Sequence, residues 1–126
     1  MSILSVVEQA YRATVEEQDD TILWISHTIK NAGAPLNVLL RSNAVNYGVK
    51  GQDASGLTIG GVALSVPPKI DHDVDELMKA GVEVYAVKED LDALGISASE
   101  LLSGIMLISQ SEIASLFNRH DAVWYW

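Results

Sequence analysis

The sequence contains no cysteine, and this absence removes several classes of chemistry at once. Disulfide bonds, thiolate nucleophiles, thiolate metal ligands and persulfides all require a cysteine sulfur. The chain can therefore form no persulfide of its own. The absence says little about compartment, because a reducing cytosol neither requires nor forbids cysteine.

Long hydrophobic runs and excess basic charge are also missing. The longest nearly uninterrupted apolar runs, such as Ile105–Ile108, are strand-sized and far shorter than the roughly 18 to 20 residues of a membrane helix. The N-terminus lacks the pattern of a secretion signal, so a cytoplasmic location is the default expectation. Eight Lys and Arg against 17 Asp and Glu give a net charge of −9, which disfavours nucleic acid and membranes as direct partners.

Common site motifs are absent as well. The sequence has no GxGxxG motif, no phosphate-binding loop and no GxSxG nucleophile turn. Its three histidines lie in separate segments without metal-ligand spacing: His27, His72 and His120. Four acids lie close together but lack the spacing of a calcium loop, which favours a solvated helix start: Asp71, Asp73, Asp75 and Glu76. We predict no metal site and no cofactor.

What is present is the composition of a folded domain. Hydrophobic residues make up 48% of the 126-residue chain and charged residues 20%, which is typical of a globular protein. A chain of this length can bury roughly two-thirds of its unfolded surface around one core. We therefore expect a single domain over residues 1–126.

Alternating strand and helix patterns follow one another along the chain. Apolar and β-branched runs predict five strands at Ile3–Val7, Leu36–Leu40, Val82–Val87, Ile105–Ile108 and Ala122–Trp126. Apolar spacings of three and four, with capping residues and closing glycines, predict helices from Asp19 to Ala32, around Ile70–Met78, over Glu89–Leu94 and over Ile113–Phe117. This alternation indicates an α/β fold with a parallel sheet covered on both faces.

Ligands of open parallel sheets bind beyond the carboxyl ends of the strands. Basic residues follow several predicted strands of this acidic chain, which predicts a site for a small anion or an acidic peptide tail. The expected contributors are Arg12, Arg41, Asn43, Tyr47 and Lys88. The alternative, that these cations are ordinary solubilising residues, stays open. Glycines interrupt every period between residues 43 and 68, so no structure is predicted there.

Several segments resemble one known family. The stretch Val82–Ile96 (VEVYAVKEDLDALGI) resembles the DsrH/TusB branch of the DsrE/DsrF/DsrH sulfur-relay family, whose members include TusD, TusC and TusB. The apolar run that follows, the helix ending near His120 and the final Trp126 are also similar to that branch. The N-terminal part is similar to the DsrE/TusD branch through Ala10-Tyr11, Ala32-Gly33 and Ala44-Val45.

This resemblance implies a three-layer α/β/α fold with a five-stranded, mainly parallel sheet. It also implies assembly into a homotrimer, a homohexamer or a mixed hexamer with related subunits. Active members carry sulfur as a persulfide on a cysteine near the end of the third strand, which is approximately Val87 here. A valine cannot form a persulfide, so the transfer activity is not carried over.

The sequence therefore predicts a non-catalytic, cysteine-free member of this family, with no catalytic residue. It would be an oligomeric subunit or an accessory protein that binds a small ligand or partner in sulfur metabolism. The expected partners are further copies of itself, related subunits or a sulfur-carrier protein. Two alternatives stay open: a cysteine-independent enzyme using Glu89, Asp90 or a histidine as acid or base, and a structural homo-oligomer with Trp124-Tyr125-Trp126 in its interface.

Overall fold

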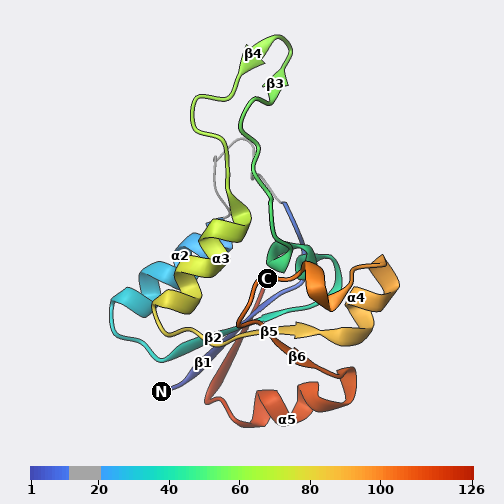
Figure 1. Cartoon of the computed structure of the whole chain (residues 1–126). Helices are drawn as coiled ribbons and strands as arrows, with labels where there is room; N and C mark the ends of the chain where they lie inside the picture. Colours follow the sequence, from blue (N-terminus) through green and yellow to red (C-terminus); the bar gives the residue numbers. More distant parts are fainter. Residues whose placement is uncertain (12–20) are drawn as a thin grey trace.

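The computed structural model describes residues 1–11 and 21–126, and its centre is a five-stranded sheet (Figure 1). The strands are β1 (Ile3–Val7), β2 (Leu36–Leu40), β5 (Val84–Val87), β6 (Met106–Ile108) and β7 (Ala122–Tyr125). Their spatial order is β6-β5-β2-β1-β7, and all four neighbouring pairs are parallel. The predicted α/β fold is confirmed, and each strand lies within the run predicted for it.

The helices also fall where the sequence patterns predict them. They are α2 (Thr21–Asn31), α3 (Ile70–Lys79), α4 (Lys88–Leu94) and α5 (Ile113–Asn118). A left-handed glycine follows α4, where Gly95 has φ +69°. Capping boxes, formed by Ser97 with Glu100 and by Ser109 with Glu112, begin the short 3₁₀ helices η2 (Ala98–Glu100) and η3 (Gln110–Glu112). Residues 12–20, which contain the predicted caps Asp19 and Asp20, lie outside the described residues.

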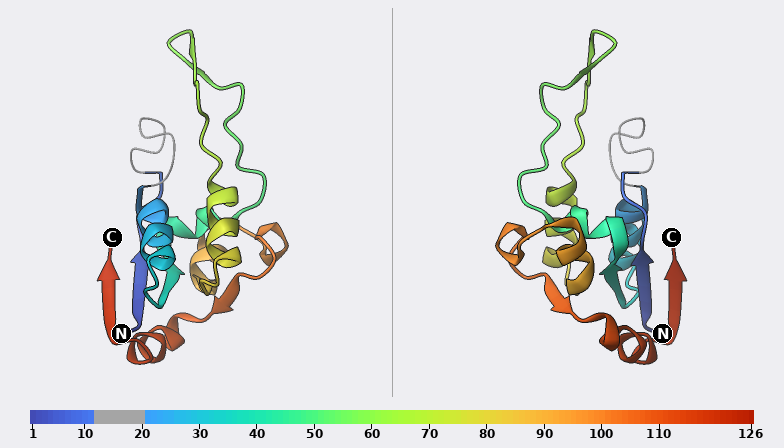
Figure 2. Two further views of the ribbon diagram at one scale, coloured as in Figure 1. Left: turned by 90° about the vertical axis from the view of Figure 1, so that its left-hand side faces the viewer. Right: turned by 90° about the vertical axis from the view of Figure 1, so that its right-hand side faces the viewer.

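The sheet is covered unequally on its two faces, as Figures 1 and 2 show. One face packs against α2, α3, α4 and the 3₁₀ helix η1 (Ser42–Gly48) in the larger hydrophobic cluster. On the other face, the helix that the described residues contribute to the smaller cluster is α5. The three inner strands, β1, β2 and β5, bury residues of both clusters, which explains why apolar residues lie on both faces of each strand instead of on one. This is the three-layer arrangement that the resemblance implies.

The segment without a predicted structure, residues 43–68, begins with η1 and continues into a long hairpin, which we call the arm (residues 53–69). A backbone bridge between Asp53 and Lys69 closes its base. Two short antiparallel strands, β3 (Thr58–Ile59) and β4 (Val62–Ala63), form its tip. Gly60 and Gly61 connect them with φ values of +59° and +80°, as a two-residue type I′ turn requires. The arm projects away from the sheet and helices in every view (Figures 1 and 2).

Candidate functional site

The carboxyl ends of β1, β2 and β5 bring three of the chain's charged residues to one edge of the sheet. These strands are neighbours, and the residues that follow them are Glu8, Arg41 and Lys88. Glu89 and Asp90 come next in the chain after Lys88. The edge therefore holds both signs of charge, whereas the sequence pattern emphasised only the basic residues.

Arg41 has a defined position at this edge. Its Nη1 donates a hydrogen bond to the Tyr125 hydroxyl at 3.0 Å, and its guanidinium lies 6.0 Å from the centre of the same ring. Burial is the main cause that raises the pKa of Tyr125; Glu8 also raises it, while Arg41 lowers it. Within residues 1–11 and 21–126, the buried Nε of Arg41 has no hydrogen-bond partner.

The two acids considered as catalytic groups hold loop backbone in place. Asp90 accepts a hydrogen bond from the Ser42 amide at 2.7 Å, where η1 begins and Ser42 adopts a left-handed φ of +50°. Glu89 accepts one from the Gln110 amide at 2.7 Å, where η3 begins. Both carboxylates thus satisfy amides at the starts of 3₁₀ helices that would otherwise lack a partner. This geometry accounts for both residues structurally.

The remaining predicted site residues lie in different surroundings. Asn43 and Lys88 are exposed, Tyr47 is fully buried, and Arg12 lies outside the described residues. Val87, which the resemblance matches approximately to the family cysteine, is only 1% exposed. The structure therefore places Arg41, Asn43 and Lys88 near the strand ends, while Tyr47 belongs to the core beneath them.

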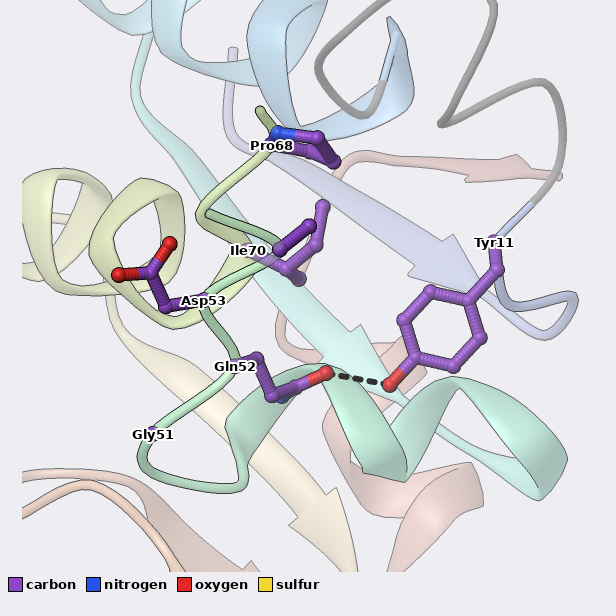
Figure 3. Close-up of a pocket in the computed structure, with 7 residues that line it drawn as sticks. Tyr11, Gly51, Gln52, Asp53, Pro68 and Ile70 are labelled. Atoms are coloured by element: carbon purple, nitrogen blue, oxygen red, sulfur yellow. Dashed lines mark hydrogen bonds between the residues drawn. The ribbon is translucent and has the colours of Figure 1, made fainter. Parts of the chain in front are cut away.

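A well-formed cavity lies elsewhere, between the loop after β1 and the base of the arm (Figure 3). It has a volume of about 340 Å³. It is lined by Tyr11, Gly51, Gln52, Asp53, Ala54, Pro68 and Ile70. Sequence reasoning missed this cavity, because most of its lining comes from the segment that had no predicted structure.

Tyr11 forms one wall of the cavity and contacts both Tyr47 and Gln52. Its ring meets the Tyr47 ring edge-on, with centres 5.2 Å apart and planes at 86°. Its amide donates to the Tyr47 hydroxyl at 2.5 Å, and its own hydroxyl donates to Gln52 Oε1. Burial raises the pKa of Tyr11. Tyr47 thus supports the cavity from below, although it does not line it.

The other polar groups of the cavity wall are also already paired. Gln52 Nε2 donates to the carbonyls of Asn46 and Val49 at 2.6 and 2.8 Å. Asp53 accepts hydrogen bonds from the hydroxyl and amide of Ser55, which lower the pKa of Asp53. A wall whose polar groups are internally satisfied favours an apolar occupant, because such an occupant leaves no hydrogen bond unmade.

The three histidines lie outside the lining of the cavity beside Tyr11. A smaller cavity of about 110 Å³ between α2 and α3 includes His27 and His72 in its lining. His120 bonds to Asn37 and to the Leu116 carbonyl, at 3.1 and 2.8 Å. Within the part of the chain that the structure describes, no cluster of three or more His, Asp or Glu side chains could hold a metal ion.

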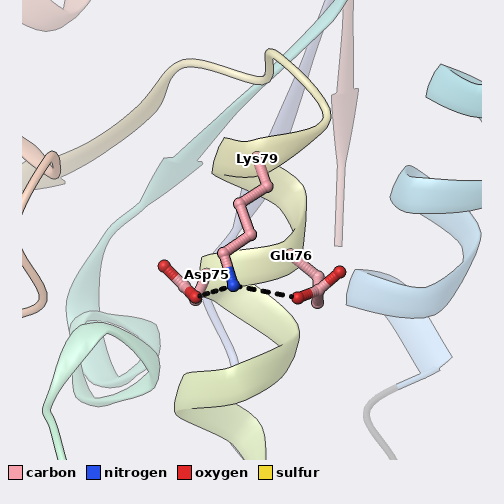
Figure 4. A network of polar contacts seen from close by, with 3 residues as sticks. All are labelled: Asp75, Glu76 and Lys79. Carbon is pink, nitrogen blue, oxygen red and sulfur yellow. Dashed lines mark hydrogen bonds and ion pairs between the residues drawn. The ribbon is translucent and has the colours of Figure 1, made fainter.

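The acids of α3 interact with a lysine on the same helix (Figure 4). Lys79 Nζ lies 2.8 Å from Asp75 and 3.3 Å from Glu76. Hydrogen bonds to these two carboxylates raise the pKa of Lys79. Both pairs are exposed and i,i+3 or i,i+4 along the helix, so each stabilises it only slightly.

None of the helices in the described residues is both long and apolar enough to cross a membrane.

No protein-family model and no curated protein matches the chain, but several solved structures share its fold. The YchN protein of Escherichia coli superposes with a TM-score of 0.69 at 20% identity, over 100% of both chains. A protein of unknown function from Methanobacterium thermoautotrophicum, MTH1491, gives 0.66 at 17% identity, over 98% of this chain and 97% of its own. A conserved protein of unknown function from Bacteroides thetaiotaomicron, BT1422, gives 0.68 at 14% identity, over 98% and 94%. At these identities the likeness shows the fold alone.

Proposed function

We propose that the protein acts by association, as a cysteine-free oligomeric subunit or accessory binding protein built on a DsrE-like fold. The observation that carries this proposal is the arm. Residues 54–68 contain no charged side chain, although the chain as a whole has a net charge of −9. Four large apolar side chains are exposed there: Leu57, Ile59, Val62 and Val66. Contiguous apolar surface of this kind typically marks an interaction site.

The surroundings of the family cysteine position support a role without covalent sulfur chemistry. Val87 offers no nucleophile, and its side chain is buried in the cluster with α5. Glu89 and Asp90, the nearest acids in the chain, hold loop amides. The link to sulfur relay rests on the resemblance of Val82–Ile96 and on the shared fold. The proposed partners are further copies, related subunits or a sulfur-carrier protein.

Light scattering of the full chain over a wide dilution range tests association directly. We expect a mass above that of the 13.6 kDa monomer, or a mixed complex when a sulfur-carrier protein is added. A monomer at every concentration, alone and with the carrier, would contradict the proposal.

The unpaired Nε of Arg41 favours a second candidate, the binding of a small oxyanion at the strand ends. A carboxylate or sulfur oxyanion could accept a hydrogen bond from this atom. Glu8 opposes such binding, because this acid lies at the same edge, where it accepts a hydrogen bond from Ser42 Oγ at 3.5 Å and raises the pKa of Tyr125. Calorimetric titration with thiosulfate or sulfite tests this candidate.

We expect Arg41→Ala to abolish that binding and Lys50→Ala to preserve it. Lys50 is the matched control, because it carries the same charge but donates to the Ser99 carbonyl. Equal weakening by both variants would indicate a general charge effect and remove support for a site at Arg41.

A further inference from the structure

The tip of the arm lacks a packing partner within the described chain. Ile59 is 53% exposed and Val62 is 69% exposed, and the two form a cross-strand pair. An added Cβ at either turn glycine would meet no atom within 4 Å. A two-stranded hairpin alone in water is at best marginally stable, so an arm of this kind needs packing from outside.

At the base of the same arm lies a cavity, whereas the tip is a projection. The cavity beside Tyr11 is concave, and Ala54, Pro68 and Ile70 contribute apolar surface to it. Its polar groups are already paired, through Tyr11, Gln52 and Asp53. One chain therefore carries an apolar projection and an apolar cavity, separated by the length of the arm, which is about 20 Å for six extended residues.

Two-fold symmetry brings these two features together. When two copies lie with their arms side by side and antiparallel, the tip of each arm meets the base of the other. An isologous interface places the same pair of contacts twice, once at each end of the paired arms. The second copy thus supplies both the apolar occupant that the cavity favours and the packing that the tip lacks.

We propose that the arm of one copy inserts the Ile59–Val62 tip into the cavity of a second copy, which receives an arm in return. This inference rests on the proposed associating function and specifies how association occurs. The charge pattern favours a second copy over a membrane, because Lys69 is the only basic side chain of the arm and the chain is acidic overall.

The absence of cysteine makes the contact testable by crosslinking. One batch of full chain carries Val62→Cys and another, with a different affinity tag, carries Ala54→Cys; the two are mixed and treated with a short bismaleimide. We expect a crosslinked pair containing both tags. Leu94→Cys replaces Ala54→Cys in the control, because Leu94 is 44% exposed at the end of α4, away from the arm (Figure 1). That control should give no crosslink above background.

A charged tip should weaken association without unfolding the domain. Ile59→Asp with Val62→Asp is expected to raise the dissociation constant at least a hundredfold, because two aliphatic side chains lose their burial. Ala114→Asp with Ser115→Asp adds the same charge at exposed positions on α5, outside the arm and the cavity, and should have a smaller effect. Circular dichroism of each variant confirms that the sheet and helices remain folded.

The outcomes separate this inference from the proposed function. An oligomer that persists in the charged-tip variant, or that crosslinks tip to tip instead of tip to base, overturns the inference and leaves association standing. A chain that is monomeric throughout overturns both. A monomer that binds phospholipid vesicles through the tip assigns the arm to a membrane and also overturns the inference.

Discussion

The strands β1 and β2 and the arm are all rich in apolar residues, yet the strands are buried and the tip of the arm is exposed. All five residues of β1 are buried, and so are four of the five in β2. In the arm, both strands of the tip are exposed along their whole length. The difference lies in the neighbours: β1 and β2 have a strand on each side and packed layers above and below, whereas the arm extends beyond the core. Apolar sequence thus becomes a stabilising core or an interaction surface according to topology.

The largest test of this comparison is truncation of one aliphatic side chain in each region. Leu39 is fully buried in the smaller cluster, so Leu39→Ala should lower the free energy of unfolding by about 2 to 5 kcal/mol. Val62→Ala should change it by less than about 0.5 kcal/mol in dilute protein. Urea unfolding followed by circular dichroism measures both. Equal losses would show that the arm is part of the cooperative core.

Thiol accessibility extends the comparison to Val87. Because Val87 is 1% exposed, a thiol introduced by Val87→Cys should react at least about a hundredfold more slowly with a chromogenic disulfide reagent than one introduced by Val62→Cys, when both are measured in protein dilute enough to be monomeric. Lys88→Cys is the adjacent control, exposed at the start of α4, and should react rapidly. Rapid reaction at residue 87 would show that the strand end opens readily.

Removing a buried hydrogen-bond acceptor should also lower the free energy of unfolding, but by less than Leu39→Ala. Ser5 and Ser26 are both 1% exposed, and Ser5 Oγ accepts hydrogen bonds from the Ser26 hydroxyl at 3.3 Å and from Trp126 Nε1 at 3.0 Å. Ser5→Ala leaves these donors without their acceptor, so it should cost about 1 to 2 kcal/mol of unfolding free energy. Ser65→Ala, on the exposed arm, is the matched control. A neutral Ser5→Ala would mean that water replaces the lost contact.

The smallest expected effect is on the pH dependence of unfolding in acid. Hydrogen bonds from the Ser2 amide and hydroxyl lower the pKa of Asp121, which joins the start of β7 to the start of the chain. A lowered folded-state pKa stabilises the fold above the unfolded value near 3.8, and this contribution is lost as pH falls through the folded-state pKa. Unfolding of Asp121→Asn should therefore vary less with pH between about 5 and 2 than unfolding of wild type.

Asp53 supplies the comparison in the arm. The pKa of Asp53 is also lowered, but by Ser55, which is only two residues away in sequence. The unfolded chain can form the same local contact, so Asp53→Asn should leave the pH dependence of unfolding nearly unchanged. An equal response of the two variants would show that the base of the arm unfolds together with the sheet.

The sequence was sufficient to predict the sheet because its strands are continuous, β-branched and separated by capped helices. It was insufficient for the arm, whose paired glycines mark a turn but whose apolar residues have no internal period. The strand-end rule placed Arg41 and Lys88 correctly at one edge, since it follows from parallel order alone. It could not show that Arg41 meets Tyr125, because that contact depends on β7 lying beside β1.

The cavity was hidden for a related reason. Tyr11 lies in the loop after the first strand, whereas Gln52 and Pro68 lie next to the two ends of the arm, within the segment that had no predicted structure. Only the bridge between Asp53 and Lys69 brings these ends together. Val87 could be matched to the family cysteine from the resemblance, but its burial depends on Ile108 and α5, which are distant in sequence.

The position of β7 in the sheet also determines how long β1 lacks its outer neighbour during synthesis of the chain. The ribosome makes β1 first and β7 last, yet they are hydrogen-bonded neighbours, with the Trp126 amide donating to the Val6 carbonyl at 2.9 Å. At typical rates of translation, the edge of β1 that pairs with β7 stays unpaired for on the order of ten seconds. During that interval the unpaired backbone groups along this edge of β1 are open to a chaperone or to another nascent chain. Slowing synthesis ahead of β7 would lengthen this exposure, which makes the timing of translation a determinant of folding yield.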